Sequence, residues 1–133
     1  MIGLDTNLLI RYIVRDDLSQ TRIADRYIDN LSKNNVSLFL NNIVLCELVW
    51  VLETTYEYDK TQIVSVIEKI LETSQFTFED TNAIWLALSA YKKSKSGFAD
   101  ALIGTINKLA GCTKTATFDK SAAKLSEFEL LAS

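Results

Sequence analysis

Four acidic residues of this chain lie in sequence surroundings that do not suit a solvated surface. Asp5 follows a short apolar run in MIGLDTN, and Asp119 follows mostly small and apolar residues in TATFDK. Glu47 lies in IVLCELVWVL, which is apolar on every side of a helix, so burying its ionised carboxylate would cost several kcal/mol unless it is paired, protonated or bound to a cation. Asp100, in SGFADALIG, lies in the first turn of a predicted helix.

Each of these acids also has a structural interpretation when it is taken alone. Asp5 suits the N-cap of the following helix, although Thr6 or Asn7 can cap that helix and leave Asp5 free to hold a metal. Glu47 suits a buried salt bridge. Asp100 suits a helix N-terminus, where the dipole favours an acid by about 0.3–1 kcal/mol, and Asp119 suits a turn or an N-cap. The chemical interpretation therefore depends on the four acids together.

Together, the four carboxylates predict a site for a divalent metal ion. Two of them end strands and a third begins a helix after a loop, so three share one edge of a parallel α/β layer, where ligands bind in such folds. Carboxylates that converge without a cation repel each other. Carboxylate oxygens without Cys or His ligands select hard ions, so we expect Mg²⁺ or Mn²⁺ as the cofactor.

The absence of histidine from the sequence narrows the possible chemistry. Without imidazole there is no Ser-His or Cys-His nucleophile, no His acid–base pair and no His metal ligand. If this chain is a hydrolase, carboxylates and a hard cation are the groups that remain to catalyse hydrolysis.

Hydrophobic periodicity and capping residues predict strands that alternate with helices. Strands are expected at residues 2–5, 37–40, 76–79, 128–131 and within 112–119. Helices are expected to begin at Thr6 or Asn7 and to cover residues 19–34, 43–56 and 98–110, with Asn41 or Asn42 as the cap of the second of these three. Further helices are expected after a cap at Asp59 or Thr61 and after a cap at Asp80 or Thr81, and a short helix is expected before the last strand. This alternation predicts the α/β class, as a three-layer sandwich with a mainly parallel central sheet flanked by helices.

Length and composition predict a single soluble domain over residues 1–133. No apolar run approaches the roughly 18 residues of a membrane helix, and no secretory signal is evident, so we expect a cytoplasmic location and no membrane partner. Cys46 and Cys112 have no partner at C-x-x-C spacing, and we expect two inert buried thiols.

The ordered set of acids resembles that of the PIN-domain ribonucleases, and in particular the VapC-type toxins of bacterial toxin–antitoxin systems. The shared segments are LDTN, LCELVWVL, FADALIG and TFDK, and the likeness spans essentially the whole chain. The resemblance implies a Mg²⁺- or Mn²⁺-dependent endoribonuclease, a hydrolase that cleaves RNA phosphodiester bonds with a metal-activated water and leaves a 5′-phosphate. It assigns the catalytic metal site to Asp5, Glu47, Asp100 and Asp119, with Thr6, Asn7 and Thr117 as polar residues around it. It also implies inhibition by a cognate antitoxin protein.

The charge of the chain is compatible with an RNA substrate, although the formal net charge is −3. Without the four site acids the remaining charges nearly balance. Basic residues cluster in the first quarter and just before Asp100, and such clusters suit a phosphate path or solvated helix faces; they comprise Arg11, Arg15, Arg22, Arg26, Lys92, Lys93 and Lys95.

Two other functions fit part of the pattern. A phosphatase or dehalogenase would use Asp5 as a nucleophile, but phosphatases of that kind usually have a second acid two residues later, where this chain has Asn7. A non-catalytic RNA-binding regulatory domain is the other alternative, and the presence of all four acids argues against it.

A self-association surface is also expected around Glu47. The helix there is apolar on more sides than one core requires, and four large aromatic residues add apolar area, namely Trp50, Tyr56, Tyr58 and Trp85. A helix packed between the sheet and a neighbouring element is the alternative. The resemblance favours a homodimer.

Overall fold

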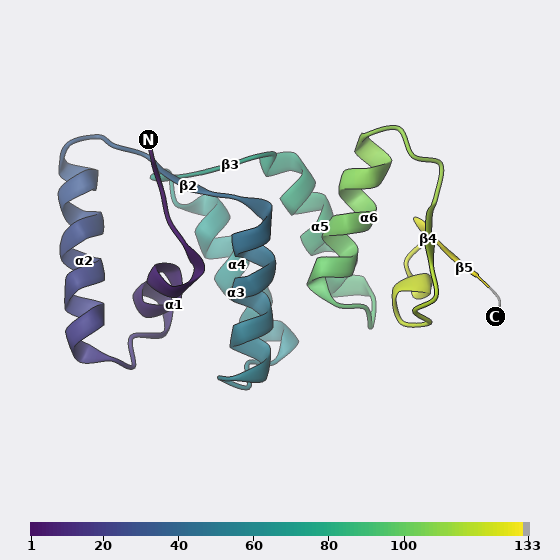
Figure 1. Ribbon diagram of the computed structural model, residues 1–133, viewed down its shortest axis with the longest axis horizontal. Coiled ribbons are helices and arrows are strands. Elements are labelled where there is room, and N and C mark those ends of the chain that lie inside the picture. Colours follow the sequence, from purple (N-terminus) through teal and green to yellow (C-terminus); the bar gives the residue numbers. More distant parts are fainter. Residues whose placement is uncertain (132–133) are drawn as a thin grey trace. The chain divides into compact units, whose positions relative to one another are not determined.

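The computed structural model describes residues 1–131, in which helices and short parallel strands alternate (Figure 1). The predicted α/β class is confirmed by six α-helices and by strands that pair only in parallel among these residues. Contacts within the chain group it into two compact units, Met1–Glu79 and Asp80–Ser133. Within the described residues, none of the helices combines the length and hydropathy that a membrane span requires.

The first unit contains a three-stranded parallel sheet and four helices. Its elements are β1 (Ile2–Gly3), α1 (Thr6–Val14), α2 (Leu18–Lys33), β2 (Leu38–Leu40), α3 (Asn42–Thr54), α4 (Lys60–Glu72) and β3 (Phe76–Phe78). The strand order is β1-β2-β3, and Leu38 lies opposite Ile2 on one side and Phe76 on the other. Because the strands run in one direction, their carboxyl ends meet at one edge of this sheet, where the chain continues to Asp5, Asn41 and Glu79.

Side-chain caps define where the helices of the first unit begin. The caps are Asp5 for α1, Asp17 for α2, Asn41 for α3 and Asp59 for α4, and each side chain accepts a hydrogen bond from a backbone N–H in the first turn. The pairs of alternative caps in the sequence are thus resolved in favour of Asn41 and Asp59. The Gln62 side chain completes a capping box with Asp59, which satisfies two backbone donors that a helix start otherwise leaves unpaired.

The core of the first unit is aliphatic and lies between the sheet and the helices. Leu38 and Leu40 of β2 are fully buried, as are Leu45, Leu48 and Leu52, which follow each other along α3 at helical spacing. Burial of each such side chain stabilises the fold by about 1.5–3 kcal/mol relative to exposure. This packing fixes α3 against the sheet and determines which of its sides points outward.

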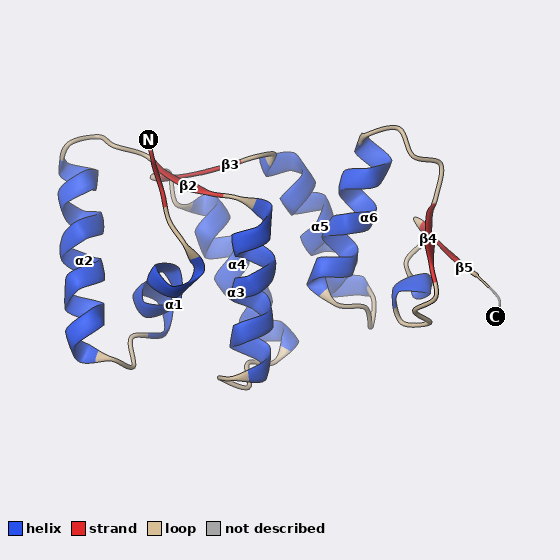
Figure 2. Ribbon diagram, viewed as in Figure 1, coloured by secondary structure: helices blue, strands red, loops and turns tan. Residues whose placement is uncertain are grey.

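The second unit contains a helix pair and a second small sheet, as Figure 2 shows by element type. Its elements are α5 (Thr81–Lys93), α6 (Phe98–Leu109), β4 (Thr115–Thr117), the short 3₁₀-helix η1 (Ala122–Lys124) and β5 (Phe128–Leu130). At the connection between the two helices, the rings of Tyr91 and Phe98 meet edge to face with centroids 5.9 Å apart. Gly111 follows α6 with φ of 103°, a conformation that suits glycine after a helix.

The strands of the described residues pair as two sheets, where the sequence predicts one central sheet. In the second unit β4 pairs in parallel with β5, with Thr115 opposite Phe128 and Thr117 opposite Leu130. Residue alternation within a strand indicates which side chains face a core, but it does not encode which strand lies beside it. For that reason the predicted strand positions are close to those observed, whereas the number of sheets differs.

Candidate metal site

Asp5 lies between β1 and α1, and its own carboxylate caps α1. Its Oδ1 accepts a hydrogen bond from the backbone N–H of Leu8 at 3.0 Å. The expectation that Thr6 or Asn7 caps this helix is wrong, because Thr6 is already helical and Asp5 has the extended backbone (φ −89°, ψ 173°) that an N-cap adopts. Within residues 1–131, no hydrogen bond engages Oδ2 of Asp5, so one carboxylate oxygen is held by the helix and the other is open to a ligand.

Glu47 is exposed on α3, so the predicted burial of this carboxylate is wrong. Residues three and four positions apart share a side of a helix, and Ile43 and Trp50, on the same side as Glu47, are 70% and 66% exposed. We call Ile43, Glu47 and Trp50 the exposed α3 face. The apolar composition of α3 on this side therefore creates an exposed hydrophobic surface beside an acid, and it does not create a buried charge.

Thr6 connects the two acids of the first unit. Its Oγ1 donates a hydrogen bond to Oε1 of Glu47 at 2.9 Å, between the first turn of α1 and the exposed α3 face. Thr6 directly follows Asp5, so this contact brings Glu47 into the neighbourhood of the acid that caps α1. The Thr6 hydroxyl therefore restrains the Glu47 carboxylate.

A groove of about 670 Å³ lies next to Asp5 within the first unit. We call it the Asp5 groove; β1, α1 and α2 line it, and its walls include Leu4, Asn7, Arg11 and Tyr27. Asn7, a predicted site residue, is exposed and contributes to this groove. The groove therefore offers a mostly apolar surface with a few polar groups directly beside a candidate metal ligand.

Asp100 is the third residue of α6 in the second unit. Its carboxylate turns back toward the helix start, since a Cβ placed on Gly97 would lie 4.0 Å from its Oδ2. Partial burial raises the pKa of Asp100, and the neighbouring charge of Asp119 raises this pKa further. The structure thus places Asp100 and Asp119 close enough for their charges to oppose each other.

Asp119 follows β4 and shapes the turn that leads into η1. Its Oδ1 accepts hydrogen bonds from the backbone N–H groups of Ser121 at 2.7 Å and Ala122 at 3.4 Å. Thr117, another predicted site residue, accepts a hydrogen bond at Oγ1 from the backbone N–H of Asp119 at 2.9 Å. Asp119 therefore has the turn-forming role that the sequence allows, while Thr117 restrains its backbone.

Ser96 is a residue of this region that the sequence analysis missed. Ser96 is 2% exposed, and its Oγ donates a hydrogen bond to the backbone carbonyl of Ser121 at 2.6 Å. This bond ties the loop before Asp100 to the turn after Asp119, which fixes the two acids relative to each other. In the sequence, Ser96 lies in the basic segment KKSKSG, which does not reveal a partner 25 positions away.

The first unit holds a second residue that the sequence analysis missed, Glu79. It follows β3 at the same sheet edge as Asp5, and its Oε2 accepts a hydrogen bond from the backbone N–H of Asn42 at 2.6 Å. An acid directly after a strand, in FTFED, is the same pattern that marks Asp5. The contact satisfies a free donor at the start of α3, so Glu79 positions the helix that carries Glu47.

The predicted metal ligands thus occur as two pairs, Asp5 with Glu47 in the first unit and Asp100 with Asp119 in the second. Among residues 1–131, no group of three acidic or thiol side chains comes together as a metal site. The donor chemistry fits Mg²⁺ or Mn²⁺, since every predicted ligand is a carboxylate and each pair includes an exposed member.

Two of the basic residues predicted to contact phosphate are engaged in ion pairs. The guanidinium group of Arg11 lies 3.2 Å from the carboxylate of Asp16. Arg15 forms a bidentate salt bridge with Asp25, in which two guanidinium N–H groups donate to the two carboxylate oxygens at 2.8 and 2.6 Å. The hydrogen bond from Arg15 lowers the pKa of Asp25. Arg11 and Arg15 therefore stabilise the turn between α1 and α2, which the phosphate-path interpretation did not anticipate.

Both cysteines are free thiols, but only one is partly buried. Burial raises the pKa of Cys46, which suits the predicted inert thiol. Cys112 is exposed, so its predicted burial is wrong. It lies in the turn after α6, where no side of a helix or strand directs it inward.

The profile of the PIN domain family matches residues 2–127, and the chain therefore belongs to the PIN domain family. Within this family the chain is similar to the curated VapC ribonuclease of Aquifex aeolicus (strain VF5). The two are 28% identical over 122 residues, which is 92% of this chain and 90% of the relative. The predicted resemblance to PIN-domain proteins of the VapC type is confirmed.

Proposed function

We propose that this protein is a Mg²⁺- or Mn²⁺-dependent endoribonuclease that acts in the cytoplasm as the toxin of a toxin–antitoxin pair. The observation that carries the proposal is the link from Asp5 through Thr6 to Glu47, which brings two carboxylates to the carboxyl end of β1. Membership of the PIN domain family and the similarity to a protein named as a VapC ribonuclease support the activity.

We assign the metal ligands to Asp5, Glu47, Asp100 and Asp119. Bound there, the metal would polarise a scissile phosphate and lower the pKa of a water molecule. The α1 N-terminus holds one oxygen of Asp5, and the Thr6 hydroxyl holds one oxygen of Glu47. In the second unit, Thr117 and Ser96 restrain the segments that carry Asp119 and Asp100. These contacts orient the acids before any ligand binds, which is the contribution that positioning makes to catalysis.

We propose further that the two units form one nuclease domain, since the family match runs through both of them. We also propose a homodimer with Trp50 of α3 at its interface and Glu47 left open to the metal, because Trp50 presents a large apolar area to solvent. Light scattering should then give twice the chain mass for the wild type and the single mass for Trp50→Ser. A monomeric wild type would contradict the dimer and leave the nuclease proposal intact.

The cognate antitoxin is proposed as the protein partner that inhibits the nuclease.

The decisive experiment incubates the purified protein with total RNA in the presence of Mg²⁺, Mn²⁺ or EDTA, and maps the ends of the fragments. We expect cleavage with either metal, none with EDTA, and 5′-phosphate ends. Glu129→Gln, an acid on β5 outside the proposed ligands, is the control and should cleave like the wild type. Cleavage that persists in EDTA, or RNA that binds without turnover, would refute the proposal.

A further inference from the structure

A hydrogen-bonded cluster of side chains lies at the end of α1, apart from the proposed metal ligands. Arg11, in the last turn of α1, donates from Nε to Oε1 of Gln20 in α2 at 2.6 Å. Its Nη1 lies 3.2 Å from Oδ1 of Asp16 and 3.4 Å from the hydroxyl of Tyr56. The Tyr56 hydroxyl in turn donates to Oδ2 of Asp16 at 3.0 Å. We call Arg11, Asp16, Gln20 and Tyr56 the Arg11 cluster.

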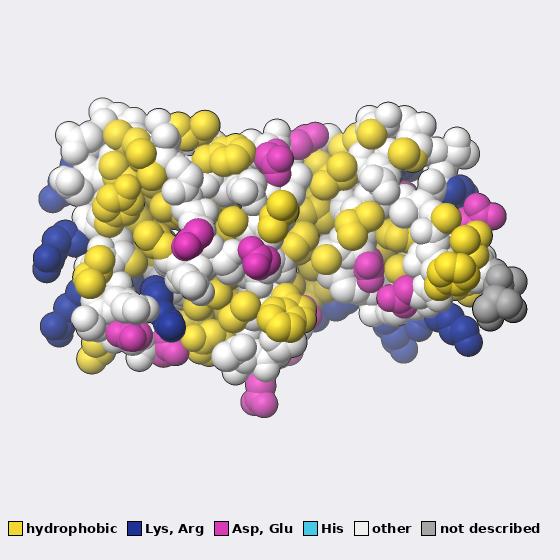
Figure 3. Space-filling model, in the orientation of Figure 1, with side chains coloured by type: hydrophobic (Ala, Val, Ile, Leu, Met, Phe, Trp, Pro, Cys, Tyr) yellow, Lys and Arg dark blue, Asp and Glu magenta, His cyan; other side chains and the backbone are white. Residues whose placement is uncertain are grey.

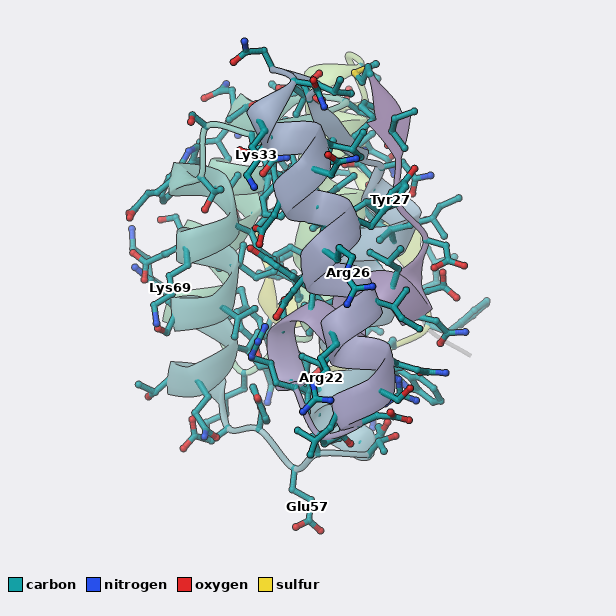
Figure 4. All side chains as sticks on the ribbon, turned by 90° about the vertical axis from the view of Figure 1, so that its left-hand side faces the viewer. Arg22, Arg26, Tyr27, Lys33, Glu57 and Lys69 are labelled. Carbon is teal, nitrogen blue, oxygen red and sulfur yellow. The ribbon has the colours of Figure 1, made fainter. Side chains whose placement is uncertain are left out.

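Tyr56 lies in the loop that follows α3, and this loop is tied to the helix. The backbone N–H of Tyr58 donates a hydrogen bond to the backbone carbonyl of Leu52 in α3 at 2.9 Å. Figure 4 shows Glu57, the next residue after Tyr56, in this loop below the lower part of α2, where Arg22 is labelled. The Tyr56 hydroxyl therefore connects the end of α3 with the end of α1 and the start of α2.

Hydrogen bonds thus join α1 to α3 and its following loop near both ends of α1. Near the start of α1, Thr6 donates to Glu47, and in the last turn Arg11 contacts Tyr56. Thr6 and Arg11 lie about 7.5 Å apart along the helix axis. Apolar packing is non-directional, whereas hydrogen bonds between defined atoms determine how one helix lies along another. A bond at one end would let α1 turn about that point, and the bond at the other end removes this freedom.

The charges of the Arg11 cluster are paired, whereas those of the proposed ligands in the first unit are not. Arg11 forms an ion pair with Asp16, and across residues 1–131 no ion pair involves Asp5 or Glu47. Figure 3 shows acidic side chains over α1 and α3, and it shows basic and acidic side chains against each other near the turn between α1 and α2. The Arg11 cluster therefore holds α1 in place without an unpaired charge of its own to attract a cation.

We propose that Arg11 and Tyr56 are positioning residues: their contact fixes α1 along α3 and thereby sets the spacing between the carboxylates of Asp5 and Glu47. The inference rests on the proposed metal-dependent nuclease and names residues that determine how well its site accepts the metal. Mg²⁺ requires near-ideal geometry, with ligands about 2.0–2.1 Å away, so a small shift of α1 should weaken its binding. The alternative is that the Arg11 cluster only stabilises the loop after α3, and the measurements below separate these two roles.

The first measurement tests the coupling between the two ends of α1 without metal. The free energy of unfolding in urea is determined in EDTA for the wild type, Thr6→Val, Tyr56→Phe and the double variant. The loss in the double variant should be smaller than the sum of the single losses, because each contact holds α1 in the position that the other contact requires. Tyr58→Phe is the matched control, since the Tyr58 hydroxyl makes no hydrogen bond among residues 1–131. Its combination with Thr6→Val should be additive.

The second measurement is the affinity for Mn²⁺, determined by titration calorimetry without RNA. Tyr56→Phe should weaken Mn²⁺ binding by about 10-fold, at the lower end of the range for residues that orient metal ligands, while Tyr58→Phe should stay within about twofold of the wild type. In cleavage assays, the Mg²⁺ concentration for half-maximal rate should rise by the same factor in Tyr56→Phe, and the rate at saturating Mg²⁺ should change little. A merely structural role of Tyr56 would not separate these two quantities.

Failure of this inference is distinguishable from failure of the nuclease proposal. Additive losses of stability for Thr6→Val and Tyr56→Phe would refute the inference, even if the wild type cleaves RNA with Mg²⁺. Equal Mn²⁺ affinity in Tyr56→Phe and the wild type would refute it as well. Coupled losses of stability together with weaker Mn²⁺ binding would support it, even if no RNA is cleaved.

Discussion

The Thr6 hydroxyl donates a hydrogen bond to Oε1 of Glu47 at 2.9 Å, across 41 positions of the sequence. The bond joins the first turn of α1 to the middle of α3, and Thr6 directly follows the acid that caps α1. The orientation of Glu47 is therefore coupled to the helix start that orients Asp5. The Thr6 side chain holds Glu47, while the backbone N–H of Leu8 in the same helix holds Asp5.

Thr6→Val should lower RNA cleavage by about 10-fold, because Glu47 loses the donor that orients it. The free energy of unfolding should fall by only about 0.5–1.5 kcal/mol, as for one hydrogen bond. Thr6→Ser keeps the hydroxyl and should retain most of the activity. Initial rates of metal-dependent cleavage and urea unfolding give the two quantities. A fully active Thr6→Val would show that the contact does not position Glu47.

Asp5→Asn separates the capping role of Asp5 from its proposed metal role. Asparagine caps helices about as well as aspartate, so the stability should be nearly unchanged, while the lost charge should abolish cleavage. Asp5→Ala should abolish cleavage and also cost about 1 kcal/mol of stability, since it leaves the Leu8 N–H without its acceptor. The measurements are thermal melting and RNA turnover. Wild-type turnover by Asp5→Asn would exclude Asp5 as a ligand.

Asp100→Asn should raise the melting temperature at neutral pH in the absence of metal. Burial and the charge of Asp119 raise the pKa of Asp100 in the folded state, so its ionised form destabilises the fold. This penalty is present above the folded pKa and disappears as the pH falls below the ordinary carboxyl value near 4. The melting temperatures of variant and wild type should therefore differ at pH 7 and converge in acid.

The control for this pH series is Glu129→Gln, an exposed acid in the same unit. It removes one acidic charge outside the pair of Asp100 and Asp119, and it should not reproduce the rise in melting temperature at pH 7. A difference between Asp100→Asn and the wild type that stays constant from pH 7 into acid would contradict the explanation by charge. Added Mg²⁺ should stabilise the wild type more than Asp100→Asn, because the variant lacks one proposed ligand.

Gly104→Ala should destabilise the protein by about 1 kcal/mol. A Cβ at this position in α6 would lie 2.7 Å from Cε2 of Phe128, so the ring of β5 must move, at a typical cost of about 1–3 kcal/mol. The better helix propensity of alanine offsets about 1 kcal/mol of this cost. Gly3→Ala is the control, since nothing lies within 4 Å of its added Cβ. Equal unfolding midpoints for the two variants in urea would show that α6 and β5 do not pack this tightly.

The positions of the helices and strands were largely predictable, because they depend on local pattern. Cap residues indicated where α3 and α4 begin, and the predicted helix over residues 43–56 lies close to the observed bounds of α3. Strand pairing was less accessible, since the partners of three-residue strands lie far apart in the sequence and alternation does not identify them. The predicted single sheet accordingly became two sheets in the described residues.

For the site, the sequence by itself determined the chemistry: carboxylates without histidine, in an order that resembles that of PIN-domain proteins. The tertiary structure decided how each acid is held. Asp5 caps α1 itself, Glu47 is exposed because the opposite side of α3 forms the core, and Thr6 and Ser96 supply hydrogen bonds across 41 and 25 positions. The identity of a side chain fixes which bonds it is able to make, but only the folded chain brings distant partners within reach.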